Sequence, residues 1–392
     1  MPVNLLQAMI NSTRLFLGII FSSILFSASA QTDIDTMVYD GLNRLYEFHI
    51  PASYDGSEEV PLVFNMHGRG SNSYQQRIYS QMDGVADLNN FIVVYPNAEF
   101  INNLRQWNLS YDASPPGVTP VIPDDVGFVD SLIDFFIANY AIDTNRIYTC
   151  GMSAGGFVSY FLSCALGERF TAMASITGLP PLSIVDSCPS VRTVPVMQVH
   201  GTADSTVEYF PSPFYIGVEG AVELIRDRNG CDAQADYRDY GDIDNDGVSA
   251  ERFIYSNCLD NGELWFYKLT NATHTWPGTP IAFPGDGVSY EIDGSTEIWR
   301  FFERFSKDPS FVYVPTDVSS IDASFQAFPN PAMERVFVPR LLQGSTYQVY
   351  SQDGRLMLES SAPQGYLEVS ELPEGMYYVS GEGYTFRVSI QR

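Results

Sequence analysis

The sequence is organised around the stretch Ile147-Tyr-Thr-Cys-Gly-Met-Ser-Ala-Gly-Gly-Phe-Val-Ser-Tyr-Phe-Leu-Ser-Cys164. A short β-prone run leads into a tight turn at 151–155, and the apolar residues that follow are typical of a helix. A serine at the apex of such a turn occupies strained backbone that exposes its hydroxyl, and any Cβ two residues away would strike the neighbouring strand or helix. We therefore predict that Ser153 is a nucleophile; a glycine-rich turn without chemistry is the alternative.

Strand-like runs alternate with helical patterns on both sides of this stretch. The runs at 62–66, 91–96 and 194–200 are short and apolar, whereas 124–140 and 291–305 have the spacing of amphipathic helices. Such alternation is typical of a mostly parallel sheet that is covered by helices on both faces. The sequence therefore predicts an α/β fold.

A serine nucleophile needs a base, and the chain has four histidines: His49, His67, His200 and His274. The first lies in an early strand, and the next two end strands just before glycines, where they shape loops. Only His274 follows both Ser153 and Asp204, an aspartate on the loop after the run at 194–200. Because α/β-hydrolases use the order Ser, Asp, His, we predict a triad of these three residues. An exposed loop histidine and a surface turn aspartate are the alternatives.

Two further segments bear on the site. The turn His67-Gly-Arg69-Gly-Ser71 follows the apolar strand at 62–66, where an α/β-hydrolase places its second oxyanion donor, a backbone N–H. An ordinary glycine turn is the alternative. Trp107 and Trp276 lie on loops, and we expect them to line a substrate cleft. Asp125 lies at a helix start, so we expect it to be structural.

Composition and leader indicate export. The net charge of −26, from 47 acidic and 21 basic residues, disfavours binding to nucleic acid or to anionic lipid. Residues 1–30 have the pattern of a signal peptide, because Arg14 precedes the apolar run at 15–26 and Ala28-Ser-Ala30 fits a cleavage site. We expect a secreted protein without a stable membrane span; a retained anchor is the alternative.

Export permits disulfides among the five cysteines. Cys150 lies in the apolar run before the tight turn and resembles a small buried hydrophobe. We expect the pairs Cys164–Cys188 and Cys231–Cys258 because each closes a local loop, although four cysteines allow three pairings.

An acidic stretch, Asp242-Ile-Asp-Asn-Asp-Gly247, matches the start of a calcium-binding loop. The twelfth position of that loop is Phe253, where such a loop needs a glutamate. We expect a solvated acidic turn, and neither a metal nor an organic cofactor; calcium binding by the turn is left open.

The pattern changes near residue 307. Residues 308–322 are polar and contain prolines, whereas 323–392 consist of short β-runs and glycine turns without a helical pattern. We therefore expect a signal peptide at 1–30, a catalytic domain at 31–307, a linker and a small all-β sandwich.

Together these motifs give the sequence a family resemblance. It resembles the extracellular esterases grouped with polyhydroxybutyrate depolymerases and feruloyl or acetylxylan esterases, over about residues 38–306. The motifs, in one order, are His67-Gly68, Val93-Val-Tyr-Pro-Asn97, Trp107-Asn108, Asp125-Val-Gly-Phe128, Gly151-Met-Ser-Ala-Gly-Gly156, His200-Gly-Thr-Ala-Asp204 and His274-Thr-Trp-Pro-Gly278.

The resemblance implies an α/β-hydrolase fold, the triad Ser153, Asp204 and His274, and an oxyanion hole formed by the backbone amides of Arg69 and Ala154. The chain departs from the family at Arg69, where a small residue or cysteine is common, and before His274, where glycines are common. Neither departure removes a catalytic group.

The tail resembles the C-terminal sorting domain of the type IX secretion system of Bacteroidetes, over about 323–392. The motifs that carry this are Phe328-Pro-Asn-Pro-Ala332, Tyr347-Gln-Val-Tyr-Ser-Gln-Asp-Gly-Arg355 and Leu372-Pro-Glu-Gly-Met-Tyr-Tyr378. A carbohydrate-binding β-sandwich is the alternative.

Both resemblances imply a secreted serine esterase that acts on feruloyl or acetyl esters of polysaccharides and is exported by the type IX machinery. A polyhydroxybutyrate depolymerase is the enzymatic alternative. An inactive polysaccharide-binding surface protein is the alternative from another class.

Overall fold

The computed structural model describes residues 30–110, 122–185, 188, 192–213, 215–281, 286–313, 335–337, 346–351, 355–361, 366–381 and 384–390. The expected signal segment lies outside the described residues except for Ala30, and so do 314–322 of the expected linker.

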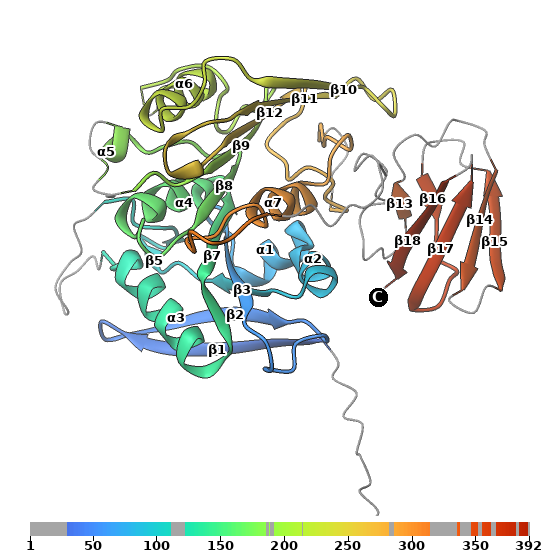
Figure 1. The fold of residues 1–392 in the computed structure, drawn as a ribbon, viewed down its shortest axis with the longest axis horizontal. Helices are drawn as coiled ribbons and strands as arrows, with labels where there is room; N and C mark the ends of the chain where they lie inside the picture. The colour runs from blue at the N-terminus through green and yellow to red at the C-terminus, as the bar shows by residue number, and fades with distance from the viewer. Residues whose placement is uncertain are drawn as a thin grey trace, which may run out of the picture.

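A ten-stranded sheet forms the centre of the described residues between 30 and 313 (Figure 1). Its strands are β1 (Gln31–Tyr39), β2 (Leu42–Ile50), β3 (Val60–Met66), β4 (Ile92–Pro96), β7 (Ile142–Met152), β8 (Ala172–Ile176), β9 (Val196–Gly201), β10 (Asp236–Gly241), β11 (Ser249–Tyr255) and β12 (Leu264–Thr270). Their order across the sheet is β1-β2-β4-β3-β7-β8-β9-β12-β11-β10. The strands from β4 to β12 are parallel, and the two strands at each edge are antiparallel. The mostly parallel sheet expected from the sequence is confirmed.

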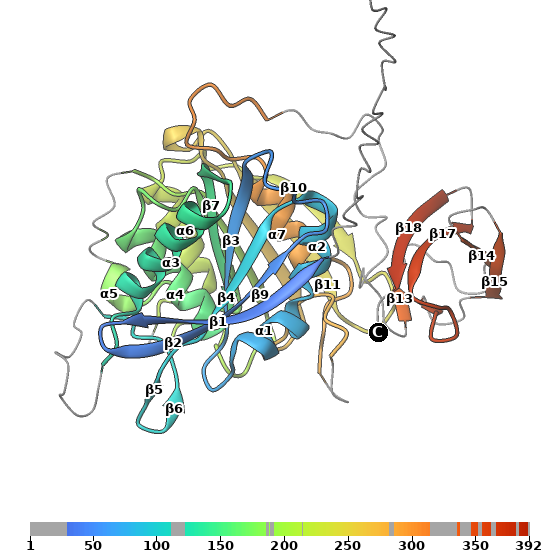
Figure 2. The ribbon, with the colours of Figure 1, turned by 90° about the horizontal axis from the view of Figure 1, so that it is seen from below.

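Helices cover both faces of this sheet (Figure 2). They are α1 (Ser73–Ser80), α2 (Met82–Asn89), α3 (Asp125–Asn139), α4 (Ala154–Ala165), α5 (Leu182–Val185), α6 (Val218–Arg228) and α7 (Gly294–Phe302), with a short 3₁₀ turn η1 (Leu259–Asn261). Alternate residues of β3 enter different clusters: Leu62 and Phe64 pack with α3 and α4, whereas Val63 packs with residues of α2 and α7. Every residue of β3 is buried, because a central strand covered on both faces has no solvent side.

Close packing shapes the turn between β7 and α4. A Cβ added at Gly155 would lie 2.0 Å from the Met66 carbonyl oxygen, and one at Gly151 would lie 2.6 Å from the same atom. A Cβ at Gly156 would lie 2.3 Å from Ser175 Oγ. The expectation that larger residues would strike the neighbouring elements is therefore confirmed.

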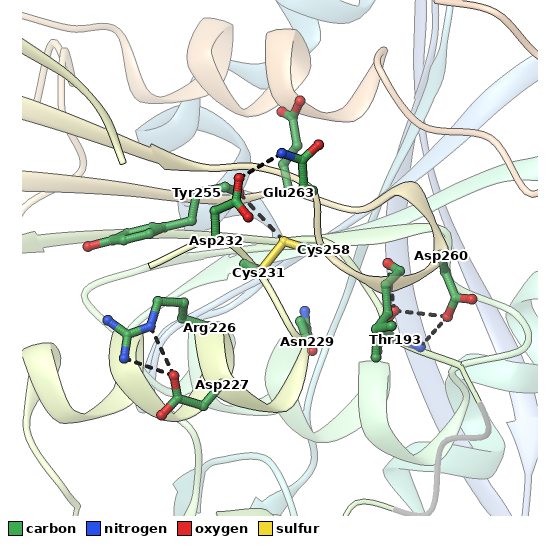
Figure 3. Close-up of a disulfide and its surroundings, with 12 residues drawn as sticks. Thr193, Arg226, Asp227, Asn229, Cys231, Asp232, Tyr255, Cys258, Asp260 and Glu263 are labelled. Carbon is green, nitrogen blue, oxygen red and sulfur yellow. Dashed lines mark hydrogen bonds and ion pairs between the residues drawn. A yellow bond between two sulfur atoms is a disulfide. The ribbon is translucent and has the colours of Figure 1, made fainter. Parts of the chain in front are cut away.

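Two disulfides join Cys164 to Cys188 and Cys231 to Cys258, whereas Cys150 is a buried free thiol. These are the pairs expected from loop closure. Figure 3 shows the second pair, which connects the end of α6 to the loop after β11.

The C-terminal residues form antiparallel sheets of their own. β13 (Arg335–Phe337) pairs with β16 (Tyr366–Glu368), and a four-stranded sheet contains β14 (Thr346–Ser351), β15 (Leu356–Ser361), β17 (Gly375–Gly381) and β18 (Tyr384–Ile390). Their apolar side chains share one buried cluster that includes Val336, Tyr347, Leu367 and Val379. The described C-terminal residues thus form the small all-β unit that the sequence predicts. A short hairpin of β5 (Phe100–Ile101) and β6 (Leu104–Arg105) lies outside both units' main sheets.

The packing at the turn can be tested by substitution. We expect Gly155→Ala to lower the free energy of unfolding by about 3 kcal/mol or more, because the methyl group meets rigid backbone. Gly220→Ala is the matched control: its nearest neighbour would be Ile216 at 3.9 Å, and alanine favours the helix by about 0.5–1 kcal/mol. Calorimetric melting of both variants checks this, and equal melting temperatures would contradict it.

Candidate active site

The residues singled out in the sequence follow the carboxyl ends of neighbouring parallel strands. Ser153 follows β7, Asp204 follows β9, and His274 follows β12. The pairing of Gly201 with Leu269 brings the ends of β9 and β12 together. Because these strands are parallel, the three candidates share one edge of the sheet. In open α/β sheets ligands bind at this edge.

Ser153 has the backbone that a nucleophile turn requires. Its φ is 57° and its ψ is −123°, a sparsely populated conformation for a residue with a side chain. The Ser153 N–H donates to the carbonyl oxygen of Ile176 at 2.8 Å, which ties the turn to β8. Helix α4 begins at the next residue, so its N-terminus faces the serine.

Asp204 and His274 form a tight hydrogen-bonded pair. The distance between His274 Nδ1 and Asp204 Oδ2 is 2.7 Å. Asp204 is buried, and its Oδ1 accepts the N–H groups of Thr206 and Val207 at 2.8 and 2.9 Å. Burial acts to raise the pKa of Asp204, but the His274 hydrogen bond and charge outweigh it and hold that pKa below its usual range. The carboxylate is therefore ionised at neutral pH and orients the imidazole.

The loop that carries His274 is held from both sides. The Ala203 N–H donates to the Ala272 carbonyl at 3.0 Å, next to Asp204, and the Thr273 N–H donates to the Gly287 carbonyl at 2.9 Å. These bonds connect the histidine loop to the aspartate loop and to the segment that precedes α7.

In the part of the chain that the structure describes, no hydrogen bond joins the Ser153 hydroxyl to His274. The His274 side chain is 20% exposed, and its Nε2 has no partner among the described residues. Hydrogen bonds between catalytic groups are often long in free enzymes and shorten when substrate binds. The imidazole is therefore partly exposed, and its Nε2 is free of hydrogen bonds to the described residues.

The turn after β3 lies against the serine. A Cβ added at Gly68 would lie 3.4 Å from Ser153 Cβ and 3.9 Å from Ser153 Oγ. The backbone N–H groups of the following Arg69 and of Ala154 have no hydrogen-bond partner among the described residues. The Arg69 side chain is exposed, and its Nε donates to Gln106 Oε1 at 3.1 Å. Two unpaired backbone donors thus lie in the residues next to the hydroxyl.

His67 supports this turn from below. Its Nδ1–H donates to the Gly68 carbonyl at 2.7 Å, and its Nε2 accepts the Ala98 N–H at 3.0 Å. Burial lowers the pKa of His67 to about 4, so the ring is neutral and fits these two roles. The side chain is a scaffold and does not face the site.

The expectation that Trp107 lines a substrate cleft is wrong. The indole is 5% exposed, and its Nε1–H donates to the His67 carbonyl at 2.8 Å. Its ring also lies against the His67 ring, with centroids 5.0 Å apart. Trp107 therefore supports the turn after β3 and has no free face for a sugar or a cinnamoyl ring.

The same expectation is wrong for Trp276, whose side chain is 1% exposed. It packs in the core with Ile292 and Trp299. A Cβ at Gly294 would lie 3.0 Å from its Nε1, so the start of α7 sits directly on the indole. A loop position in the sequence does not show which way the ring points, and here both rings point inward.

His200 is also structural, as expected. Its Nε2–H donates to the Val207 carbonyl at 2.8 Å, and its Nδ1 lies 3.2 Å from Gln198 Nε2. Burial lowers the pKa of His200 to about 4, so the ring is neutral. It holds the loop that contains Asp204.

A buried ion pair between β2 and the start of α3 was not predicted from the sequence. Asp125 Oδ1 lies 2.5 Å from Arg44 Nη2, and its Oδ2 accepts the Asn108 N–H at 2.7 Å. The Arg44 guanidinium also lies over the Phe128 ring, 4.0 Å from its centroid. Asp125 is thus structural, as expected, but its partner could not be chosen from the sequence.

A hollow of about 780 Å³ lies beside the Cys164–Cys188 disulfide, between α4 and α6. Neither Ser153, Asp204 nor His274 lines it. It is not part of the candidate active site.

We expect Asp125→Asn to lower the free energy of unfolding by about 3 kcal/mol, because it removes the closer and fully buried ion pair of Arg44 and leaves only Glu99, whose Oε1 lies 3.4 Å from Arg44 Nε. Asp124→Asn is the control: Asp124 caps α3 by accepting the Gly127 N–H at 2.9 Å, and asparagine caps equally well. Denaturant unfolding of both variants checks this, and similar losses would refute a role for the buried charge pair.

Comparison with known proteins places both parts of the chain. Residues 45–205 match the family described as esterase PHB depolymerase, and residues 326–388 match the secretion system C-terminal sorting domain. A bifunctional acetylxylan esterase/xylanase of Neocallimastix patriciarum is 26% identical over 63% of this chain and 34% of its own length. A feruloyl esterase B of Piromyces equi is 28% identical over 41% and 29%. A poly(3-hydroxyalkanoate) depolymerase C of Paucimonas lemoignei is 27% identical over 34% and 30%.

The chain thus spans about a third of the length of each of these relatives. Among solved structures, an acetyl xylan esterase from Aspergillus awamori has a TM-score of 0.47 and 14% identity, covering 62% of this chain and 94% of that one. None of the described helices has the length and apolar content that a bilayer crossing needs. The sorting domain marks the protein for export by the type IX route. The chain is therefore similar to the esterase PHB depolymerase family over residues 45–205 and to the secretion-system C-terminal sorting domain over residues 326–388.

Proposed function

We propose that this protein is a secreted serine carboxylic-ester hydrolase with Ser153 as nucleophile, His274 as base and Asp204 as the acid of the triad. The observation that carries the proposal is the 2.7 Å bond between His274 Nδ1 and Asp204 Oδ2, at the same sheet edge as the strained Ser153. The family match over residues 45–205 supports it independently.

The first half of the reaction forms an acyl-enzyme. His274 Nε2 takes the proton of the Ser153 hydroxyl while Oγ attacks the ester carbonyl carbon. The tetrahedral intermediate then expels the alcohol, which receives its proton from His274. Asp204 stays ionised throughout, because its low pKa prevents protonation, and it stabilises the imidazolium.

The carbonyl oxygen becomes an oxyanion in this step. The backbone N–H groups of Arg69 and Ala154 are the proposed donors, since both lack partners among the described residues and both neighbour the serine turn. Each donor of this kind contributes on the order of 3 kcal/mol to the stability of the transition state. His67 and Trp107 position the first donor through the backbone of the turn.

The second half of the reaction releases the acid. Water gives a proton to His274 Nε2 and attacks the acyl carbon; Ser153 Oγ leaves and recovers its proton from the imidazolium. The chemistry needs no group beyond these side chains and backbone amides.

We propose feruloyl or acetyl esters of polysaccharides as the substrates. The names of the Neocallimastix and Piromyces relatives support this choice. Polyester depolymerisation is the second candidate, favoured by the family's own description and by the Paucimonas relative. Because Trp107 and Trp276 are buried, no aromatic platform of theirs argues for either one.

Substitutions of His274 and His200 distinguish a catalytic role from a structural one. We expect His274→Ala and Ser153→Ala each to lower kcat by about 10⁴-fold or more, because triad members act as a unit. Ser153→Ala should leave the melting temperature nearly unchanged, whereas His274→Ala also removes a partner of the buried Asp204 and should lower it. His200→Gln should instead lower the melting temperature and leave most of the activity, since it supports a loop from the interior. Turnover of p-nitrophenyl acetate and labelling by a fluorophosphonate probe measure both effects. An inactive binding protein would not be labelled at Ser153, and wild-type activity of Ser153→Ala would refute the nucleophile.

The substrate class is tested by a panel of esters. We expect kcat/KM to be higher for methyl ferulate or acetylated xylan than for short 3-hydroxybutyrate oligomers. The opposite ranking, measured with the same purified protein, would assign the protein to polyester depolymerisation and leave the triad proposal intact.

A further inference from the structure

Carboxylates from two distant segments converge on the side of the sheet near α7. Asp242, Asp244 and Asp246 lie on the loop between β10 and β11, and Glu291 lies just before α7. One oxygen from each carboxylate lies within 4.8 Å of one oxygen from each of the others. None of the four forms an ion pair with a Lys, Arg or His in the described parts of the chain, so nothing there balances their charge.

The loop matches the first half of a calcium-binding loop in its residue types and at its glycine. Its aspartates occupy positions one, three and five, and Gly247 at position six has a φ of +92°, which only glycine adopts readily. The Gly247 N–H donates to Asp242 Oδ2 at 3.0 Å, and the Val248 N–H donates to Asp246 Oδ1 at 2.7 Å. Backbone N–H groups of the loop thus bond two of its carboxylates and hold them close together.

Phe253, at position twelve, is the reason for expecting no calcium from the sequence. It lies on β11, pairs with Phe266 of β12, and stacks on that ring with centroids 5.7 Å apart. The chain therefore enters the sheet instead of bending back to supply a ligand. Glu291 takes the place of the missing glutamate from a segment about fifty residues away.

Glu291 is the independent observation that points to a cation. Its side chain is 2% exposed. Oε2 accepts the Ser289 hydroxyl at 2.7 Å, whereas Oε1 is buried and has no hydrogen-bond partner among the described residues. A buried carboxylate oxygen without a partner costs several kcal/mol unless a positive charge compensates it.

We propose that Asp242, Asp244, Asp246 and Glu291 bind a calcium ion. All four ligands are carboxylate oxygens, which suits a hard cation, and a flexible loop with several carboxylates suits Ca²⁺ better than the smaller and more demanding Mg²⁺. Soft metals such as zinc prefer nitrogen and sulfur ligands, and the set contains neither.

The ion would fasten the loop that carries His274. The Asn271 side-chain amide donates to the Gly247 carbonyl at 2.8 Å, and the Thr273 N–H donates to the Gly287 carbonyl at 2.9 Å. One bond reaches the aspartate loop, and the other reaches the segment that ends in Glu291. Calcium would therefore join the two supports of the histidine loop, outside the reaction itself.

The first test measures binding to the full-length protein after treatment with EDTA. We expect titration calorimetry to show one Ca²⁺ per chain, with a dissociation constant of about 10⁻⁴ M or tighter, and millimolar CaCl₂ to raise the melting temperature by roughly 5 °C. MgCl₂ at the same concentration should raise it by less than half as much. A melting temperature that does not respond to calcium would overturn the proposal.

Variants decide whether these carboxylates are the ligands. Glu291→Gln and Asp244→Asn should lose the calcium-dependent rise in melting temperature, whereas Asp236→Asn, an exposed acid on β10, should keep it. In EDTA, Glu291→Gln should melt no lower than the wild type, because it removes a buried and unpaired charge. A Glu291→Gln protein that retains the full calcium response would refute the site. Because these readouts do not involve ester turnover, the result does not depend on the proposed function.

Discussion

The contact between the serine turn and the end of β3 governs the geometry of the site. Gly151 and Gly155 both pack against the Met66 carbonyl so closely that neither position has room for a Cβ. This packing brings β7, α4 and β3 together, so the turn at Gly68 lies directly beside Ser153. The proposed nucleophile and one proposed oxyanion donor are consequently placed by a single steric constraint between backbone atoms.

Two buried histidines support the loops on either side of that contact. His67 bonds the backbone after β3, and His200 bonds the backbone around Asp204 after β9. Both are neutral because burial lowers the pKa of each to about 4. A neutral imidazole supplies one donor and one acceptor and so can satisfy two buried backbone groups without burying a charge. His274 differs in being partly exposed and paired with an ionised carboxylate.

Three buried carboxylates differ in how their negative charge is compensated. Arg44 and Asp125 compensate each other in the interior, and Asp204 is compensated by hydrogen bonds from His274 and backbone amides. Glu291 has one oxygen without any such partner in the described parts of the chain. The contrast is informative, because the fold provides partners for its other buried carboxylates near the site. A bound cation would compensate Glu291 as these partners compensate the other buried carboxylates.

Local pattern in the sequence was enough to predict the serine turn, the mostly parallel sheet and the pairing of cysteines that are close in the chain. It also predicted the structural roles of His200 and Asp125. Each depends on residues close in the chain or on the order of strands. Tertiary structure alone decided the rest. It turned Trp107 and Trp276 inward, paired Arg44 with Asp125 across 81 residues, and brought Glu291 to the aspartate loop. The physical reason is that such contacts depend on which strands become neighbours and on how deeply each loop packs, and neither is encoded in the spacing of nearby residues.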